Sequence, residues 1–331
     1  MADLRLSLAC WDYDRTRPLI DGTVKPEGIE LEVTVLRPRQ IFPRMLEEQA
    51  FDAAEISLAS HASLVGRGTS PFVAIPVAVS KIFRHSCIYV RSDAGIRAPE
   101  DLRGARVGTT QIGSTAVVFM KGLLADDHGV AQHDLRWYMG GLTAPTQRPL
   151  IPLDLPPDVH LQFLPQGRTL EGMLADGELD ALLSIYLPQL FLDSLRRPDG
   201  SPRIERLFPD YRVREERYYR RTGIFPIMHT VALREEVHRR HPEAAASLYD
   251  AFRRASRVAQ ERLYDTDALH VTLPWLIHHV EEARSVFGDD YWAHGLEANR
   301  PTWEALGRYV HEQGLSPRAV APEELFVPGI G

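Results

Sequence analysis

Apolar positions in the first 90 residues alternate between strand-like and helix-like spacing. Residues Arg5 to Ala9 place an apolar side chain at every second position, which is typical of a half-buried strand. By these criteria, strands are expected at 5–9, 29–35 and 52–56, and helices near Arg17, at 38–49 and at 57–65. Repeated β/α alternation predicts a largely parallel sheet covered by helices.

The alternation restarts after two further strands and then gives way to helices. Strands are expected at 72–79, 82–90, 159–164, 180–184 and 225–233, a short helix and a strand within 99–108, and helices at 113–124, 234–264, 274–287 and 302–313. Gly177 should end the helix that precedes 180–184, and Pro242 should break the first C-terminal helix. We therefore expect two crossings, near residues 90 and 225, between lobe I (1–90 plus 225–331) and lobe II (91–224).

A chain with two α/β lobes and two crossover strands resembles the type II periplasmic-binding-protein fold. The resemblance is carried by residues 100–104 (EDLRG) with 107–108 (VG), and by 176–181 (DGELDA). It implies two lobes, each a mainly parallel sheet flanked by helices, that close a cleft on a small ligand.

Composition narrows the class of protein. No apolar run approaches the roughly 20 residues that span a bilayer, and the apolar N-terminal run reaches Asp12 too soon for a signal peptide, so a cytoplasmic location is expected. The two cysteines, Cys10 and Cys87, have no metal-site spacing and suit a reducing compartment. A net charge of −7 without a basic stripe disfavours a nucleic-acid partner. With only three lysines, a lysine-held pyridoxal cofactor is also disfavoured.

In such folds the ligand lies beyond the carboxyl ends of strands, beside helix N-termini that favour anions. Three segments are expected there, at 11–17, at 55–57 and at 109–114. The candidate ligand contacts in them are Tyr13, Arg15, Thr16, Ser57, Thr109, Thr110, Gly113 and Ser114. Arg15 has the fork geometry that binds a carboxylate through two hydrogen bonds. The alternative is that Thr16 and Ser114 only cap helices and that the arginines pair with Asp12 and Asp14.

Three titratable residues are candidates for proton transfer. His229 lies at the second expected crossover, and His85 lies beside Arg84 in an otherwise apolar predicted strand, so at least one of that pair should face the cleft. Glu55 is flanked by apolar residues, and desolvation there would raise its pKa and make it a proton donor. The alternatives are structural histidines and a Glu55–arginine pair.

No metal site is expected. His238 and His241 have a spacing that could bind one ion, but arginines surround them, and His278 and His279 are adjacent on a helix and cannot easily face one ion. No nucleophile-elbow, zincin or nucleotide-binding motif is present in the sequence.

Several longer motifs resemble the 4,5-dihydroxyphthalate decarboxylase family. They are 12–16 (DYDRT), 83–86 (FRHS), 206–211 (RLFPDY), 218–229 (YYRRTGIFPIMH) and 273–276 (LPWL). The resemblance runs from about residue 4 to 327. It implies a role in phthalate degradation, with loss of CO2 from a hydroxylated aromatic dicarboxylate and formation of 3,4-dihydroxybenzoate without a cofactor.

This chemistry suggests roles for the candidate residues. His229 and His85 would divide the acid and base roles with Glu55 as reserve acid, while Arg15, Arg84, Arg148 and Arg168 would hold carboxylates. The expected partner is a small anionic aromatic substrate, and the protein is expected to be a homo-oligomer. The alternatives are a non-catalytic binding protein for a small aromatic or carboxylate ligand, which the fold often is, and a lyase of the chorismate dehydratase type.

Overall fold

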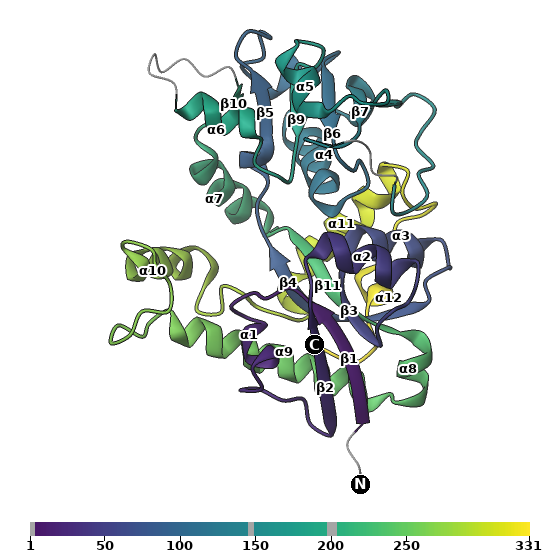
Figure 1. Ribbon diagram of the computed structural model, residues 1–331, viewed down its shortest axis with the longest axis vertical. Coiled ribbons are helices and arrows are strands. Elements are labelled where there is room, and N and C mark those ends of the chain that lie inside the picture. Colours follow the sequence, from purple (N-terminus) through teal and green to yellow (C-terminus); the bar gives the residue numbers. More distant parts are fainter. Residues whose placement is uncertain (1–3, 145–148, 197–203) are drawn as a thin grey trace. The chain divides into compact units, whose positions relative to one another are not determined.

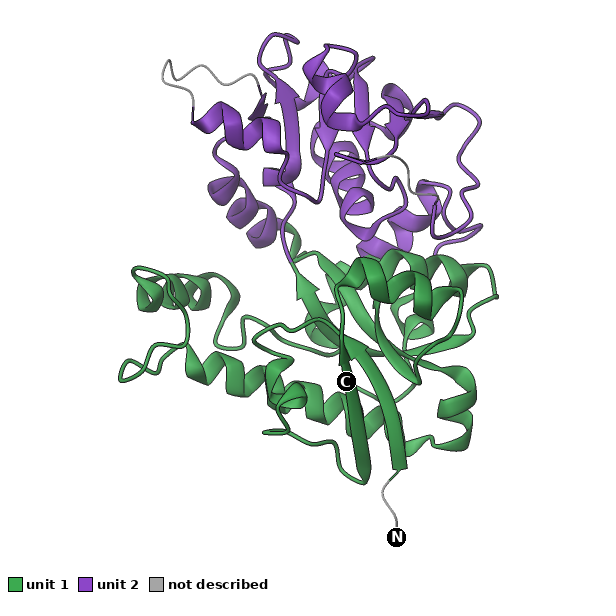
Figure 2. Cartoon of the chain, viewed as in Figure 1, with its two compact units in different colours: residues 1–81, 222–304, 320–331 green, residues 82–221, 305–319 purple. Residues whose placement is uncertain are grey.

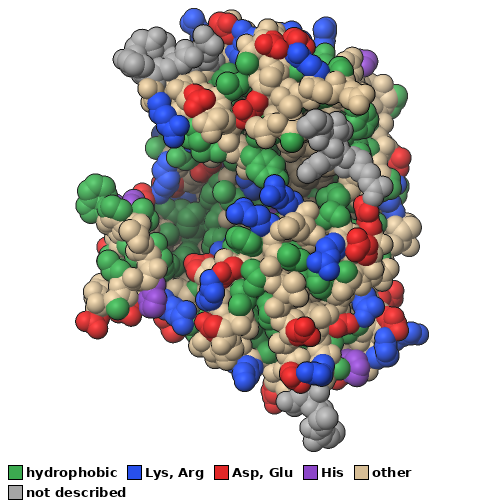
Figure 3. All heavy atoms as spheres, viewed as in Figure 1, with side chains coloured by type: hydrophobic (Ala, Val, Ile, Leu, Met, Phe, Trp, Pro, Cys, Tyr) green, Lys and Arg blue, Asp and Glu red, His purple; other side chains and the backbone are tan. Residues whose placement is uncertain are grey.

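The computed structural model describes residues 4–144, 149–196 and 204–331. The chain forms two compact units, shown in Figure 2. Unit 1 comprises residues 1–81, 222–304 and 320–331, and unit 2 comprises residues 82–221 and 305–319. None of the described helices is long and apolar enough to cross a membrane. On the face shown in Figure 3, acidic and basic side chains are interspersed over the surface.

Unit 1 contains a five-stranded sheet in the order β2-β1-β3-β11-β4 (Figure 1). Its strands are β1 (Leu4–Cys10), β2 (Ile29–Val35), β3 (Ala53–Ser57), β4 (Phe72–Lys81) and β11 (Ile227–Arg234). Its helices are α1 (Arg17–Ile20), α2 (Pro38–Leu46), α3 (Leu58–Gly66), α8 (Glu235–Arg240), α9 (Glu243–Arg262), α10 (Leu276–Phe287) and α12 (Pro322–Leu325). Along α9, the buried residues Ala244, Leu248, Ala251 and Ala255 recur at helical spacing and pack on the sheet core.

Unit 2 contains a six-stranded sheet in the order β10-β5-β9-β6-β7-β8. Its strands are β5 (Ile88–Arg91), β6 (Arg106–Thr109), β7 (Arg136–Met139), β8 (His160–Phe163), β9 (Ala181–Leu183) and β10 (Ile204–Arg206). Its helices are α4 (Thr115–His128), α5 (Leu170–Ala175), α6 (Gln189–Leu195) and α7 (Tyr211–Thr222), whose last residue falls in unit 1. Gly177 follows α5 with φ +78°, the left-handed conformation expected where that helix ends.

Both sheets are mixed, because each combines the expected parallel strands with antiparallel ones. In unit 1, β1 is parallel to β2 and β3, but β11 is antiparallel to both of its neighbours. The chain leaves this unit at the end of β4 and returns just before β11, and Ile227 pairs with Lys81. A strand that starts where its neighbour ends must run antiparallel to it. In unit 2, β5 is likewise antiparallel to β9 and β10.

The observed division of the chain differs from the expected one in its boundaries. The crossings fall at 81/82 and 221/222 instead of near residues 90 and 225, and residues 305–319 join unit 2 instead of lobe I. This last segment includes the end of α11 (Arg300–Glu312). Tyr309 packs against α4, where a Cβ atom on Gly122 would lie 2.3 Å from the tyrosine ring, so only glycine leaves room for it.

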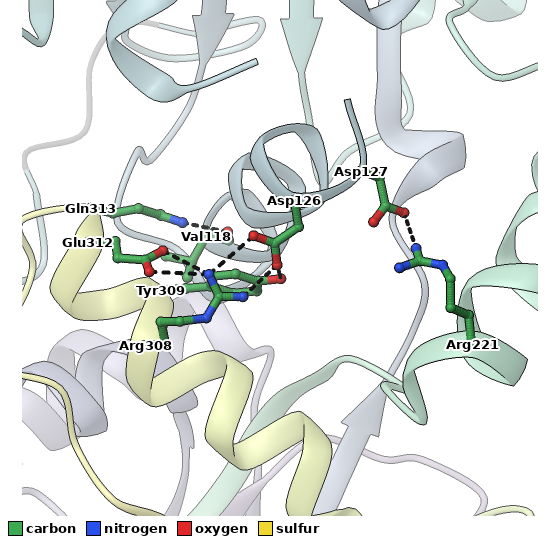
Figure 4. A network of polar contacts seen from close by, with 8 residues as sticks. All are labelled: Val118, Asp126, Asp127, Arg221, Arg308, Tyr309, Glu312 and Gln313. Carbon is green, nitrogen blue, oxygen red and sulfur yellow. Dashed lines mark hydrogen bonds and ion pairs between the residues drawn. The ribbon is translucent and has the colours of Figure 1, made fainter. Parts of the chain in front are cut away.

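Polar contacts also attach this segment to unit 2 (Figure 4). Arg308 forms a 2.5 Å ion pair with Asp126, and the Tyr309 hydroxyl donates to the same carboxylate at 2.7 Å. The Gln313 side chain donates to the Val118 carbonyl at 2.9 Å. A sequence pattern contains no signal for contacts over nearly 200 residues, which is why the assignment of this segment was missed.

Candidate functional site

The centre of the candidate site is Glu55, in the middle of β3 with a fully buried side chain. Its carboxylate accepts hydrogen bonds from the Tyr13 hydroxyl (2.7 Å), from His229 Nδ1 (2.6 Å) and from the backbone N–H of Trp11 (3.0 Å). An unpaired buried carboxylate would be prohibitively costly, and these three donors replace the water it has lost.

These donors also decide the protonation state of Glu55. Burial works to raise the pKa of the carboxyl, but the bonds from His229, Tyr13 and Trp11 outweigh it and hold the pKa below its ordinary value. The sequence-based expectation of a raised pKa is therefore corrected. Glu55 is an ionised hydrogen-bond acceptor in this environment, and no arginine pairs with it among the contacts described.

His229 is oriented by this carboxylate. An ionised carboxylate can only accept, so the proton of the shared bond belongs to Nδ1. Phe42 packs edge-on against the imidazole with centroids 5.0 Å apart, which fixes the ring plane. The side chain remains 20% exposed. The other ring nitrogen, Nε2, is thus left free to exchange protons with a ligand, as in other histidines held by a carboxylate behind them.

Arg15 lies between two aromatic rings. Its guanidinium is 4.2 Å from the Tyr13 ring centroid and 4.4 Å from that of Trp292, and its Nε donates to the Val79 carbonyl at 2.5 Å. One terminal nitrogen also pairs with Asp14 at 2.9 Å. Arg17 pairs with Asp12. The expected alternative, arginines paired with neighbouring aspartates, is therefore present for both, but Arg15 is additionally stacked between two rings and mostly buried.

Thr16 and Ser57 have local roles. The Thr16 hydroxyl donates to the Trp11 carbonyl at 2.7 Å and accepts from the Tyr13 N–H at 2.9 Å, so it closes the loop that presents Tyr13. The side chain is fully buried, which places it behind the loop instead of in contact with a ligand. Ser57 caps α3 by accepting a 3.5 Å contact from the Ser60 N–H.

Lys81 is a residue that sequence reasoning missed. It ends β4 in a buried position, and its Nζ donates to the Ala293 carbonyl and to Asn299 Oδ1, both at 2.8 Å. Burial lowers the pKa of this ammonium to about 7. These bonds hold residues 292–299 along β4 and so keep Trp292 against Arg15. The sequence does contain a signal that could have identified Lys81: it is a lysine at the end of an apolar strand, in a chain whose positive charge comes mostly from arginine.

His85 and Arg84 do not lie in a strand as predicted, because β4 ends at Lys81 and the chain turns through a 3-10 helix at His85–Cys87. The His85 ring is 4% exposed and packs edge-on against Phe208 and Tyr218. Its Nδ1 lies 3.7 Å from Glu215. Arg84 contacts the Cys87 sulfur at 3.7 Å.

The end of β6 and the start of α4 give unit 2 its own candidate ligand contacts. Thr109 and Thr110 are buried at the end of the strand, and Ser114 precedes the first turn of α4 without capping it through its side chain. The hydroxyls of Thr109 and Ser114 are buried without a hydrogen-bond partner. At Gly113 a Cβ atom would approach Leu315 to 3.3 Å. Two unsatisfied hydroxyls beside a helix N-terminus suit an anionic ligand group.

The two remaining candidates for the site are the arginines Arg168 and Arg148. Arg168 is on the surface, where it pairs with Asp176 at 3.0 Å and Glu178 at 2.5 Å, so its charge is already compensated. Arg148 lies outside the described residues. Among the described residues, no cluster of three or more His, Cys, Asp or Glu side chains could hold a metal ion.

Solved structures define the class of fold. Protein AF1704 from Archaeoglobus fulgidus aligns over 94% of this chain and 98% of its own, with a TM-score of 0.51 and 15% identity. The sulfonate-binding proteins SsuA of Escherichia coli (TM-score 0.50, 11% identity, 99% and 92% covered) and of Xanthomonas axonopodis pv. citri (0.51, 13%, 99% and 98%) are similar as well. The predicted periplasmic-binding-protein fold is thereby confirmed.

Sequence relatives are more specific. The 4,5-dihydroxyphthalate decarboxylase of Comamonas testosteroni is 38% identical over 328 residues, which cover 99% of this chain and 98% of the relative. The enzyme of the same name from Pseudomonas putida is 37% identical over 220 residues, 66% of this chain and 83% of the relative. No protein-family model matches. The chain belongs to the 4,5-dihydroxyphthalate decarboxylase family, as the sequence motifs indicated.

Proposed function

We propose that this chain is a carboxy-lyase that converts 4,5-dihydroxyphthalate into 3,4-dihydroxybenzoate and CO2. The observation that carries the proposal is a buried Glu55–His229 pair in a chain 38% identical, over 99% of its length, to an enzyme named for this reaction.

The reaction requires only proton transfers and the departure of CO2. Each carboxylate of the substrate is para to a hydroxyl group, so removal of that phenolic proton pushes electron density onto the ring carbon that bears the carboxylate. Protonation of this carbon gives a dienone. The carbon–carbon bond to the carboxylate then breaks, its electron pair restores the aromatic ring, and the phenol regains its proton. The net change is replacement of one carboxylate by hydrogen, with uptake of one proton.

We assign proton delivery at the ring carbon to His229 Nε2. The ionised Glu55 at Nδ1 stabilises the positive charge that the ring carries before it donates, and fixes the ring orientation. Glu55 itself is enclosed by its three donors and is a positioning residue. The role of His85 as base for the phenol stays a prediction from the sequence. The His85 ring lies in unit 2, where it packs against Phe208 and Tyr218.

We assign the carboxylate that stays on the ring to Arg15. Val79 and Asp14 engage Nε and Nη1 of this guanidinium, so the proposal assigns the carboxylate to Nη2. The two stacked rings limit the rotamer freedom of Arg15, which reduces the entropy cost of binding. In unit 2, taken by itself, the unpaired hydroxyls of Thr109 and Ser114 are proposed as contacts for an anionic group.

Turnover in deuterium oxide tests the proposed reaction. Purified protein incubated with 4,5-dihydroxyphthalate should release one CO2 per substrate and yield 3,4-dihydroxybenzoate with one deuterium at the former carboxylate carbon. Chromatography with mass detection resolves both products. Substrate binding by calorimetry without any product would contradict the enzyme and favour a binding protein.

We also propose that the protein acts in the cytoplasm as a homo-oligomer. Both cysteines are free and buried, which suits a reducing compartment. Leu269, Leu273 and Trp275 are exposed large apolar side chains within seven residues of sequence before α10, as expected for a surface that a second copy covers. Cell fractionation and light scattering after size exclusion test the two statements, and a periplasmic monomer would contradict both.

A further inference from the structure

Unit 1 contains a second concave region outside the Glu55–His229 cluster. It is a pocket of about 920 Å³ that α9, α10 and residues 289–298 help to line. Neither Tyr13, Glu55 nor His229 belongs to its lining. Tyr291, Ala293 and His294 line it, whereas Trp292 between them stacks on Arg15. The same short segment therefore serves the pocket and the candidate reaction site.

Three polar groups of the pocket wall lack partners. Ser256 Oγ, Tyr291 Oη and His294 Nε2 are among the buried side-chain atoms of the described residues that make no hydrogen bond. The contacts of His294 indicate that this wall lacks a hydrogen-bond acceptor. His294 Nδ1 accepts from the Ala78 N–H at 3.0 Å. The proton of the neutral ring then belongs to Nε2, which is a donor without an acceptor. Burial, first of all, and nearby cations lower the pKa of His294 to about 3, which keeps the ring neutral.

Three arginines line the pocket beside these groups, and so do the acidic residues Glu261, Asp289 and Asp290. Arg253 and Arg257 are one turn apart on α9, and no described ion pair involves either of them, whereas Arg284 of the same pocket lies 3.6 Å from Asp289. Aromatic rings accompany the charges. Arg253 lies 5.8 Å from the Tyr249 ring centroid, and Arg284 lies 5.1 Å from that of Tyr264.

We propose that this pocket is a second binding site, distinct from the reaction site, for a planar organic anion that carries a carboxylate. The anion pairs with Arg253 and Arg257, its ring lies against the tyrosines, and its oxygens accept from the polar wall. This assignment gives the unpaired donors and the unpaired cations a common partner. A pocket of this volume is within the ordinary range for small organic ligands, roughly 300–1,000 Å³.

Calorimetry with 2-naphthoate tests the site, with 2-naphthamide as the uncharged control. Wild-type protein should bind naphthoate and should bind the amide at least tenfold more weakly. The reaction-site variant Arg15→Lys, which loses the guanidinium nitrogen Nη2 assigned to the carboxylate, should bind naphthoate as wild type does. Arg253→Ala/Arg257→Ala should weaken naphthoate binding at least tenfold. The matched variant Arg239→Ala/Arg240→Ala on α8 removes the same charge outside the pocket and should bind as wild type does.

Tyr291→Phe keeps the ring and removes one hydroxyl. It therefore tests whether the polar wall of the pocket binds the anion, even if the double arginine variant fails to fold. It should weaken naphthoate binding about threefold to tenfold.

Equal weakening in the α8 variant, unchanged binding in both pocket variants, or no binding to the wild type would overturn the proposal. Turnover of 4,5-dihydroxyphthalate should be unchanged in the pocket variants, and its joint loss with naphthoate binding would overturn the claim of a distinct site. Because the binding measurement does not depend on turnover, its outcome is separate from that of the proposed reaction.

Discussion

Two carboxylate clusters, one in each unit, share the same components and differ in their cation. In unit 1, Glu55 accepts from a tyrosine hydroxyl and from His229. In unit 2, Asp126 accepts from the Tyr309 hydroxyl and from Arg308 (Figure 4). In both, burial works to raise the carboxyl pKa and the hydrogen bonds outweigh it.

The difference lies in what the cation can do. Arg308 is permanently charged and is divided between Asp126 and Glu312, so it fixes residues 305–319 to α4 and has no proton to exchange. An imidazole, unlike a guanidinium, can both accept and donate a proton, and Glu55 uses only one nitrogen of the His229 ring. A carboxylate–tyrosine pair that binds an arginine therefore has a structural role. The same pair bound to a histidine is suited to proton transfer.

The largest effect is expected for His229→Ala. Removal of the proposed proton donor should lower kcat about 10²- to 10⁴-fold, and added imidazole should restore part of the rate. Initial rates of CO2 release measure both effects. His133→Ala, which removes an exposed histidine from unit 2, is the control and should retain wild-type turnover.

Glu55→Gln should have the next largest effect. The amide keeps the shape of the side chain but loses the charge that stabilises the imidazolium, so kcat should fall about 10- to 10²-fold with little change in KM. Steady-state kinetics separates these parameters. An increase in KM alone would show that Glu55 contributes to binding and not to proton transfer.

Arg308→Ala should affect stability and spare catalysis. Loss of the Asp126 ion pair should lower the free energy of unfolding by about 1–2 kcal/mol, while kcat stays within about twofold because Arg308 has no role in the proposed chemistry. Urea titration and turnover measure the two quantities. A loss of turnover without a loss of stability would contradict the structural role.

The smallest effect is the pH dependence of stability. The folded-state pKa of Glu55 lies below its ordinary value of 4.5, so its stabilising contribution is complete above 4.5 and is lost as the pH falls through the folded-state pKa. The stability difference between wild type and Glu55→Gln should therefore shrink as the pH falls below 4.5. Urea titrations between about pH 3 and 7 measure this, and a constant difference would contradict an ionised Glu55.

The candidate residues of unit 1 lie within strands of one sheet or just after them. Tyr13 and Arg15 come after β1, Glu55 lies in β3 and His229 in β11, and strands of one sheet bring such positions together whatever their separation in the chain. The periodicity therefore predicted the strands that carry these residues, but not the hydrogen bonds that join Tyr13 and His229 to Glu55.

What could not be predicted depends on packing between distant segments. Trp292 reaches Arg15 because Lys81 and Asn299 hold its loop on β4, and no local pattern encodes that contact. Residues 82–90 have strand-like character throughout, but only residues 88–90 lie in a strand, whereas His85–Cys87 form a 3-10 helix just after the chain has left unit 1. The direction of the Glu55 pKa shift also required its three donors, which burial alone does not reveal.

The most direct test of the carboxylate–histidine unit is the kcat of the double variant Glu55→Gln/His229→Ala beside those of its two single variants. If Glu55 acts only through His229, the double variant should be no slower than His229→Ala. A double variant slowed by the product of the two single losses would show that the residues act independently and would contradict the account.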